Sequence, residues 1–136
     1  MINPKLKTKI DKIIRTFLSA NINLQIDYKE TYKLELVDYL ESLILEKGFS
    51  KVYSKDLYVD SLFTNEVDKN NQLIIPKWLE EPSIVILYNI PYYLYHTTNN
   101  LLLNKHVYFG KKIDSSKTKF ILIDNRKYDV ENIIKV

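Results

Sequence analysis

The chain has 136 residues, of which 46% are hydrophobic, so it is long enough to bury the core of one domain. It has 20 Lys and Arg against 17 Asp and Glu, a formal net charge of +3 at pH 7. The chain has no cysteine, which excludes disulfides, thiolate catalysis and cysteine-based zinc sites. No apolar run approaches the roughly 20 residues of a membrane span.

Basic side chains are concentrated at the two ends of the chain. Residues 1–20 carry five of them against Asp11, residues 101–136 carry eight against four acids, and residues 21–100 carry seven against twelve acids. Lysines beside an acidic middle indicate a polyanion bound by the two ends, and an ordinary solvated surface is the alternative. Abundant Lys, Ile, Asn and Tyr with only 2 Gly indicate an AT-rich genome, as in an organelle or a low-GC microbe.

A helix is expected over residues 3–20, opened by an Asn-Pro pair in which asparagine caps and proline suits the first helical position. One buried stripe recurs at helical spacing: Leu6, Ile10, Ile13, Ile14 and Phe17. Lys5, Lys9 and Lys12 fall on another face, where lysines near a helix start gain nothing from the helix dipole. A phosphate-bearing partner would explain them, and solubility alone is the alternative.

A strand and a second helix follow. Apolar and polar residues alternate over 22–26, the period of a strand with one buried face. Asp27 and Glu30 have the spacing of a capping box, and Gly48 is expected to end the helix. The apolar face of that helix is predicted to comprise Leu36, Val37, Leu40, Leu43 and Ile44.

The middle of the chain is predicted to be mostly strand. Mixed aromatic, β-branched and charged residues indicate one or two strands over 51–63, and Asn70-Asn71 predicts a hairpin turn with a returning strand over 73–75. A continuous apolar run over 83–88 predicts a fully buried strand.

Residues 90–103 are expected to form an aromatic strand, an exposed polar tip and a return to the core. Two hydroxyls and two amides cannot be buried cheaply without partners. They should therefore lie at a solvent-facing strand end, free to bond phosphates, sugars or base edges. The tip follows His96 and consists of Thr97, Thr98, Asn99 and Asn100.

A last buried strand is predicted over 120–123, and the tail from Asp129 is predicted to be a short helix. The order helix, strand, helix and then strands indicates an α+β fold. We expect two small lobes: a helix-strand-helix-strands lobe over 1–76 and a mainly β lobe over 77–136.

Known catalytic patterns are absent from the sequence, which has no glycine-rich phosphate loop, HExxH motif, nucleophile elbow or Ser/His/Asp set with credible spacing. His96 and Thr97, as neighbours in an extended chain, would point to opposite faces. We expect a solvent-exposed helix face, rather than a metal or acid/base cluster, from Glu35, Asp38 and Glu41. We therefore expect no enzyme activity, no cofactor and no metal.

Several segments follow one another in a defined order. They are a helix with Arg15 near its end, a strand over 22–26, a helix ending in Glu46-Lys47-Gly48-Phe49, a strand over 84–88 after Pro82, and the polar run 96–102. This order resembles the small-subunit ribosomal protein eight family, in which the polar run is a Ser-Thr-Ser-x-Gly loop followed by two aliphatic residues. Ser83 and Asn100 stand where that family has glycine.

The resemblance implies a two-lobed structural protein of the ribosome that binds the central domain of small-subunit ribosomal RNA and supports its assembly. Neighbouring ribosomal proteins would be its partners, without a membrane or an obligate homo-oligomer. Composition favours a mitochondrial ribosome, and the bacterial cytoplasm is the alternative. The implied RNA-binding residues are the tip, Tyr88, C-terminal lysines and one face of the first helix: Thr97, Thr98, Asn99, Asn100, Tyr88, Lys105, Lys111, Lys112, Lys117, Lys5, Lys9, Lys12 and Arg15.

The segment from Val67 to Leu79 resembles the signature of swapped-hairpin, AbrB-type transcription regulators, so DNA binding is the alternative function. Asn71 and Gln72 stand where that family has a Gly-Arg pair whose arginine is a main source of DNA affinity. Nearby carboxylates also oppose a DNA surface: Glu66, Asp68, Glu80 and Glu81. A third interpretation is a small viral or accessory protein whose exposed aromatic residues contact a protein partner.

Overall fold

The computed structural model describes residues 2–60, 67–72, 74, 76, 78, 81–103, 107–108, 111–112 and 118–135. Its elements, in chain order, are α1 (Pro4–Ser19), β1 (Leu24–Asp27), α2 (Leu34–Glu46), β2 (Val52–Asp56), β3 (Ile84–Tyr88), η1 (Tyr92–Leu94), α4 (Tyr95–Leu103), β4 (Val107–Tyr108), β5 (Lys111–Lys112), β6 (Lys119–Ile123) and β7 (Asn132–Lys135). The predicted mixture of helices and strands in an α+β fold is confirmed. No helix in these ranges is long and apolar enough to cross a membrane.

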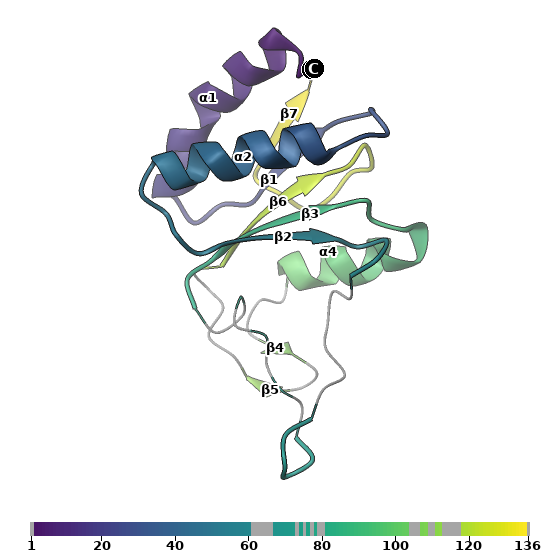
Figure 1. Cartoon of the computed structure of the whole chain (residues 1–136). Coiled ribbons are helices and arrows are strands. Elements are labelled where there is room, and N and C mark those ends of the chain that lie inside the picture. Colours follow the sequence, from purple (N-terminus) through teal and green to yellow (C-terminus); the bar gives the residue numbers. More distant parts are fainter. Residues whose placement is uncertain are drawn as a thin grey trace.

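Five strands form one parallel sheet in the order β2-β3-β6-β1-β7 (Figure 1). Because β1 lies between β6 and β7, strands from the ranges 1–76 and 77–136 share this sheet. Helices α1 and α2 cover one face and α4 covers the other (Figure 1). The short strands β4 and β5 pair separately and antiparallel.

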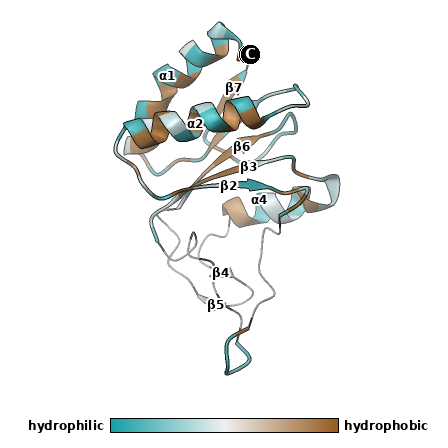
Figure 2. Cartoon of the chain, viewed as in Figure 1, coloured by the Kyte–Doolittle hydropathy of each residue, from teal (hydrophilic) through white to brown (hydrophobic). Residues whose placement is uncertain are grey.

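Covering the sheet on both faces explains the continuous apolar strands β3 and β6, which Figure 2 colours as hydrophobic. Ile84 and Ile86 point into the core layer under α1 and α2, whereas Val85 and Leu87 point into the layer that contains Leu101 and Leu102 of α4. Such double burial is typical of strands in a parallel sheet, so the prediction of a buried strand over 83–88 is confirmed.

Helix α1 forms as its sequence predicts. The Asn3 side chain accepts a hydrogen bond of 2.8 Å from the Lys5 N–H, and Leu6, Ile10, Ile14 and Phe17 are buried. Its last turn is held by Lys119 of β6, whose Nζ donates to the carbonyls of Phe17 and Leu18 at 2.7 and 2.8 Å. A lysine there complements the negative end of the helix dipole and bonds carbonyls that have no partner within the helix.

Helix α2 begins later than predicted and ends as predicted. The expected capping box at Asp27 and Glu30 is wrong, because the helix starts at Leu34 and its N-cap residue Lys33 forms no side-chain cap. At the other end Gly48 adopts a φ of +94°, a left-handed conformation that glycine tolerates best.

Three local predictions are wrong because long-range packing prevails over local pattern. Residues 90–95 do not form a strand: Pro91 leads into η1 and then α4. The strand over 22–26 does not have a polar face in water, since Asn23 and Gln25 are only 3% and 2% exposed. The tail forms β7 rather than a helix, because its residues pair with β1.

Two further predictions are confirmed in part. Strand β2 occupies 52–56 of the range 51–63. The turn at Asn70-Asn71 is present, with Asn71 at a φ of 62° and the Asp68 N–H donating to the Gln72 carbonyl at 2.8 Å. Two residues of the expected returning strand, Leu73 and Ile75, lie outside the described residues.

Candidate functional site

Helix α1 and edge strand β7 lie side by side (Figure 1). A shallow groove of about 650 Å³, open to solvent, runs between them. Lys9, Lys12 and Lys135 line it, together with Ile13, Thr16 and residues 132–134. The Lys9 ammonium donates a hydrogen bond to the Lys135 carbonyl, which joins the first helix to the last strand. The groove thus gathers basic groups from the two ends of the sequence.

The groove is suited to an anion. All charged side chains among its described lining residues are lysines, and Lys9, Lys12 and Lys135 are exposed. Asp11, the acidic residue of α1, is turned toward the other helix, where it accepts a hydrogen bond of 2.5 Å from the Tyr39 hydroxyl. Asp11 therefore does not line the groove, although together with Lys12 it lines a second depression between α1 and α2.

Spacing along α1 explains which predicted basic residues meet. Lys5, Lys9 and Lys12 recur at intervals of four and three residues, so they share one face of the helix, and Lys5 is exposed on it. Arg15, three residues after Lys12, lines a second depression, between α1 and α2, together with Lys12, Asp11 and Glu46. The structure therefore brings Lys9 and Lys12 together with Lys135 in the groove beside β7, whereas Arg15 lies beside Lys12 without lining that groove.

The predicted polar tip is part of helix α4, so the prediction that it ends a strand is wrong. Thr98 is 0% exposed, and its hydroxyl has no hydrogen-bond partner among the residues that the structure describes. Asn99 is held by Asp129: its amide donates to the carboxylate at 2.9 Å, and its carbonyl oxygen accepts from the Asp129 N–H at 2.9 Å. Thr97 is half-buried and Asn100 is exposed.

The reason for this correction is helical periodicity. Thr98, Leu101 and Leu102 stand at intervals of three and four residues, and α4 buries all three against the sheet. The tip residues consequently lie on the face of the sheet opposite to α1 (Figure 1). The tip and the lysines of α1 do not form one continuous surface.

The remaining predicted RNA-binding residues lie elsewhere. Tyr88 is 8% exposed and packs in the core layer of α1 and α2 rather than standing free for stacking. Burial raises its pKa, and the nearby carboxylates Asp56, Asp60, Glu41 and Asp38 raise it further. Lys105 and Lys117 lie outside the described residues, and for Lys111 and Lys112 the structure describes strand β5 alone.

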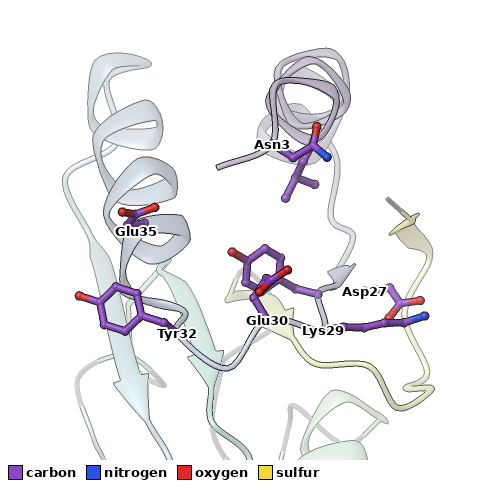
Figure 3. Close-up of a pocket in the computed structure, with 8 residues that line it drawn as sticks. Asn3, Asp27, Lys29, Glu30, Tyr32 and Glu35 are labelled. Carbon is purple, nitrogen blue, oxygen red and sulfur yellow. The ribbon is translucent and has the colours of Figure 1, made fainter. Parts of the chain in front are cut away.

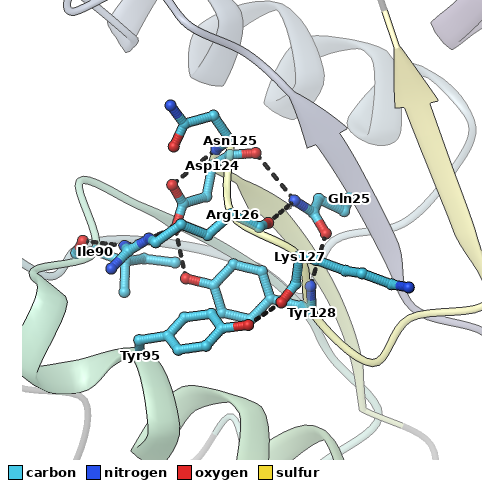
Figure 4. Close-up of polar contacts among 8 residues, drawn as sticks. All are labelled: Gln25, Ile90, Tyr95, Asp124, Asn125, Arg126, Lys127 and Tyr128. Atoms are coloured by element: carbon cyan, nitrogen blue, oxygen red, sulfur yellow. Dashed lines mark hydrogen bonds and ion pairs between the residues drawn. The ribbon is translucent and has the colours of Figure 1, made fainter.

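A polar network that the sequence analysis missed joins β1 to the segment after β6 (Figure 4). The chain from β6 to β7 passes over β1, and the Gln25 side chain binds this crossing segment. The Gln25 amide donates to the carbonyls of Asp124, at 3.0 Å, and Arg126, and its oxygen accepts from the Tyr128 N–H at 3.2 Å. Gln25 thereby replaces the backbone pairing that a crossing segment lacks.

Asp124 is the centre of the same network. Its Oδ2 accepts from Arg126 Nη2 at 2.7 Å, from Arg126 Nε at 3.0 Å and from the Tyr128 hydroxyl at 2.5 Å (Figure 4). Burial raises the pKa of Tyr128, and the hydrogen bond to Asp124 raises it further. The Arg126 guanidinium also lies 5.2 Å from the centre of the Tyr95 ring. With its oxygens engaged in this way, Asp124 serves to hold the crossing segment.

The sequence did contain a signal for the edge of the sheet where the strands have their carboxyl ends. Asp27 ends β1, Asp56 ends β2 and Asp124 follows β6, so three of the strands lead into an aspartate. Carboxyl ends of parallel strands meet at one edge, where many α/β proteins bind ligands. Within the described ranges, however, no three His, Cys, Asp or Glu side chains are placed to hold a metal ion.

Figure 3 shows a separate pocket of about 410 Å³ beyond the carboxyl end of β1. Its charged lining residues are Asp27, Lys29, Glu30 and Glu35. Burial raises the pKa of Tyr28, and Glu30 and Glu35 raise it further. Three carboxylates against one ammonium oppose a phosphate, so this pocket differs in sign from the groove beside β7.

Comparisons with protein-family models, with curated proteins and with solved structures found no match to this chain.

Proposed function

We propose that this chain is an RNA-binding protein without catalytic activity that holds the RNA backbone in the groove between α1 and β7. The observation that carries the proposal is the convergence of Lys9, Lys12 and Lys135 in one groove, with no carboxylate among its described lining residues. Lysines that face a polyphosphate release its counterions, which supplies affinity without reading sequence.

The form of the groove supports a backbone ligand. Thr16 and Asn132 add a hydroxyl and an amide beside the lysines, and such groups suit phosphate oxygens and ribose 2′-hydroxyls. Strand β7 lies at the edge of the sheet, where backbone groups on its outer side are not used for pairing within the sheet. A linear polyanion can thus follow α1 along its lysine stripe.

A place in the small ribosomal subunit, with ribosomal RNA and neighbouring ribosomal proteins as partners, is the specific form of this proposal. It rests on the segment order that resembles the ribosomal protein eight family, and a mitochondrial compartment rests on composition. The tip on α4 does not support it, because Thr98 is buried and Asn99 is bonded to Asp129. The basic groove is the surface on which the proposal depends.

The test compares a transcript of the central domain of small-subunit ribosomal RNA with an unrelated RNA hairpin and a DNA duplex. Affinity is measured by fluorescence anisotropy across a series of salt concentrations. We expect binding that weakens steeply with salt, and Lys9→Glu with Lys12→Glu should reduce the slope of log K against log salt by about two. Stronger binding to the ribosomal transcript than to the hairpin supports the ribosomal form of the proposal.

A matched control reverses two other exposed lysines, Lys69→Glu with Lys127→Glu, which lie on the turn after residue 67 and on the segment after β6. This control changes net charge by the same amount, so it should alter affinity far less than the α1 variant. Equal loss in both variants would mean that net charge alone attracts the RNA. Preference for the DNA duplex would instead favour a transcription regulator.

A further inference from the structure

The segments that follow edge strand β2 and its neighbour β3 carry large exposed hydrophobic side chains, three of them tyrosines, that the RNA-binding groove does not use. Tyr58 is 77% exposed, Val59 78%, Tyr92 85% and Tyr93 66%. We call these four residues the tyrosine patch. Single exposed apolar residues are ordinary, whereas several large ones at one edge of a domain mark an interaction surface.

The patch is one surface because its two segments are tied together. Tyr58 and Val59 follow β2, and Tyr92 and Tyr93 follow β3, which is the neighbouring strand in the sheet. The Leu57 N–H donates to the Tyr88 carbonyl at 2.9 Å, so the chain leaving β2 stays beside the chain leaving β3.

Three more contacts fix the geometry of the patch. The Asn89 amide donates to Asp56 Oδ2 at 3.1 Å, while Asp56 Oδ1 accepts from the Tyr58 N–H at 3.0 Å. The Tyr92 and Tyr93 rings meet edge to face with their centres 5.7 Å apart. The aromatic side chains therefore project from a braced backbone, which lowers the entropy lost when a partner binds.

Two carboxylates lie in the same turn as Tyr58 and Val59. Asp56 accepts from the Tyr58 N–H at 3.0 Å, and Asp60, whose N–H donates to the Asp56 carbonyl at 2.7 Å, is exposed. Both carboxylates also raise the pKa of the Tyr88 hydroxyl, after burial. Aromatic rings attract ammonium and guanidinium groups through cation–π contacts. Neighbouring carboxylates attract the same groups by charge and repel phosphates.

We propose that the tyrosine patch binds a lysine- and arginine-rich segment of a partner protein. The charge of the surface selects this occupant: the patch lies at the β2 side of the sheet, whereas the lysine groove lies at β7, the opposite edge. Tyrosine is enriched among the residues that carry most of the energy of protein interfaces. A basic protein bound at one edge and RNA bound at the other would not compete.

The probe is a fluorescein-labelled peptide of ten residues that alternates arginine and serine, and its control replaces each arginine by glutamate. Anisotropy titrations of the full chain should show binding of the arginine peptide and none of the glutamate peptide. Tyr92→Ser with Tyr93→Ser should weaken binding about tenfold, as truncation of interface tyrosines does. Asp60→Asn should weaken it about threefold, because it removes one rim charge.

Phe49→Ser is the control, since Phe49 is an aromatic residue that is 39% exposed but lies after α2, in a depression whose charged lining residues are Lys51 and Lys119. It should leave peptide affinity unchanged. Lys9→Glu with Lys12→Glu should also leave it unchanged, so failure at the patch and failure at the groove are separate results. Urea unfolding of the Tyr92 and Tyr93 variant confirms that it is folded.

Three results would overturn the proposal. The first is equal binding of the arginine peptide to the wild type and to the Tyr92 and Tyr93 variant, which would indicate unspecific charge attraction. The second is no binding by the wild type. The third is sedimentation that shows the wild type associating with itself through these tyrosines in place of the peptide, which would make a second copy the occupant.

Discussion

Replacing Gln25 by leucine tests whether this buried amide holds the segment that crosses β1. Leucine has a similar volume and cannot donate or accept, so Gln25→Leu removes three hydrogen bonds at a side chain that is 2% exposed. The carbonyls of Asp124 and Arg126 and the N–H of Tyr128 lose their partner. These backbone groups belong to the crossing segment and face Gln25, on the side where water has little access.

The expected loss of stability follows from these three groups. A buried polar group left without a partner costs about 1 to 3 kcal/mol, and partial relaxation together with the apolar gain of leucine offsets part of the sum. We expect Gln25→Leu to lower the free energy of unfolding by about 3 kcal/mol, against a typical total of about 5 to 15 kcal/mol. For a chain of this length the melting temperature should fall by roughly 10 °C.

Urea unfolding followed by circular dichroism measures this loss. Gln72→Leu is the matched control, because Gln72 is exposed in the turn at 68–72 and the hydrogen bonds found for it there use its backbone. The control should change stability by less than about 0.5 kcal/mol. A Gln25→Leu variant within about 1 kcal/mol of the wild type would refute the role given to this side chain.

Three other substitutions have defined outcomes. Thr98→Val removes a buried hydroxyl that has no partner among the described residues, so we expect equal or higher stability by urea unfolding and unchanged RNA affinity. Weaker RNA binding would restore the polar tip as a contact. Gly48→Ala should lower the free energy of unfolding by about 1 kcal/mol, because alanine is strained at a φ of +94°. No described atom lies within 4 Å of the added Cβ, so no clash adds to this cost, and an unchanged urea midpoint would contradict the prediction. Burial and the hydrogen bond to Asp11 raise the pKa of Tyr39 from 10.0 to about 12, so the stability that this residue contributes is present below pH 10 and is lost as the pH rises toward 12. Tyr39→Phe should therefore lose less stability than the wild type between pH 10 and pH 12 in urea titrations, and parallel pH profiles would argue against this linkage.

Local sequence signals predicted the elements whose information is local. The Asn-Pro opening and the apolar stripe located α1, and continuous apolar runs located β3 and β6. The all-parallel strand order could not be read in this way, because β1 pairs with strands about a hundred residues later in the chain. Asn23 and Gln25 looked like an exposed face for the same reason, since their partners lie in that distant part.

Residues 90–103 show how burial overrides propensity. Tyrosine and threonine favour strands, and the run of polar residues suggested a solvent-facing tip. Packing of Leu101 and Leu102 against the sheet instead favours a helix, which also carries Thr98 inward. The candidate site was half predictable: Lys9 and Lys12 could be placed on one helix face, but Lys135 joins them only through the fold.

RNA bound between α1 and β7 should change the environment of the backbone amides that line this groove. Amide chemical-shift mapping of the nitrogen-15-labelled protein during titration with a structured RNA measures this residue by residue. We expect shifts at Lys9, Lys12, Thr16 and residues 132–135 that shrink as salt is added, with the amides of α4 unmoved. Shifts centred on α4, or no shifts at all, would contradict RNA binding in this groove.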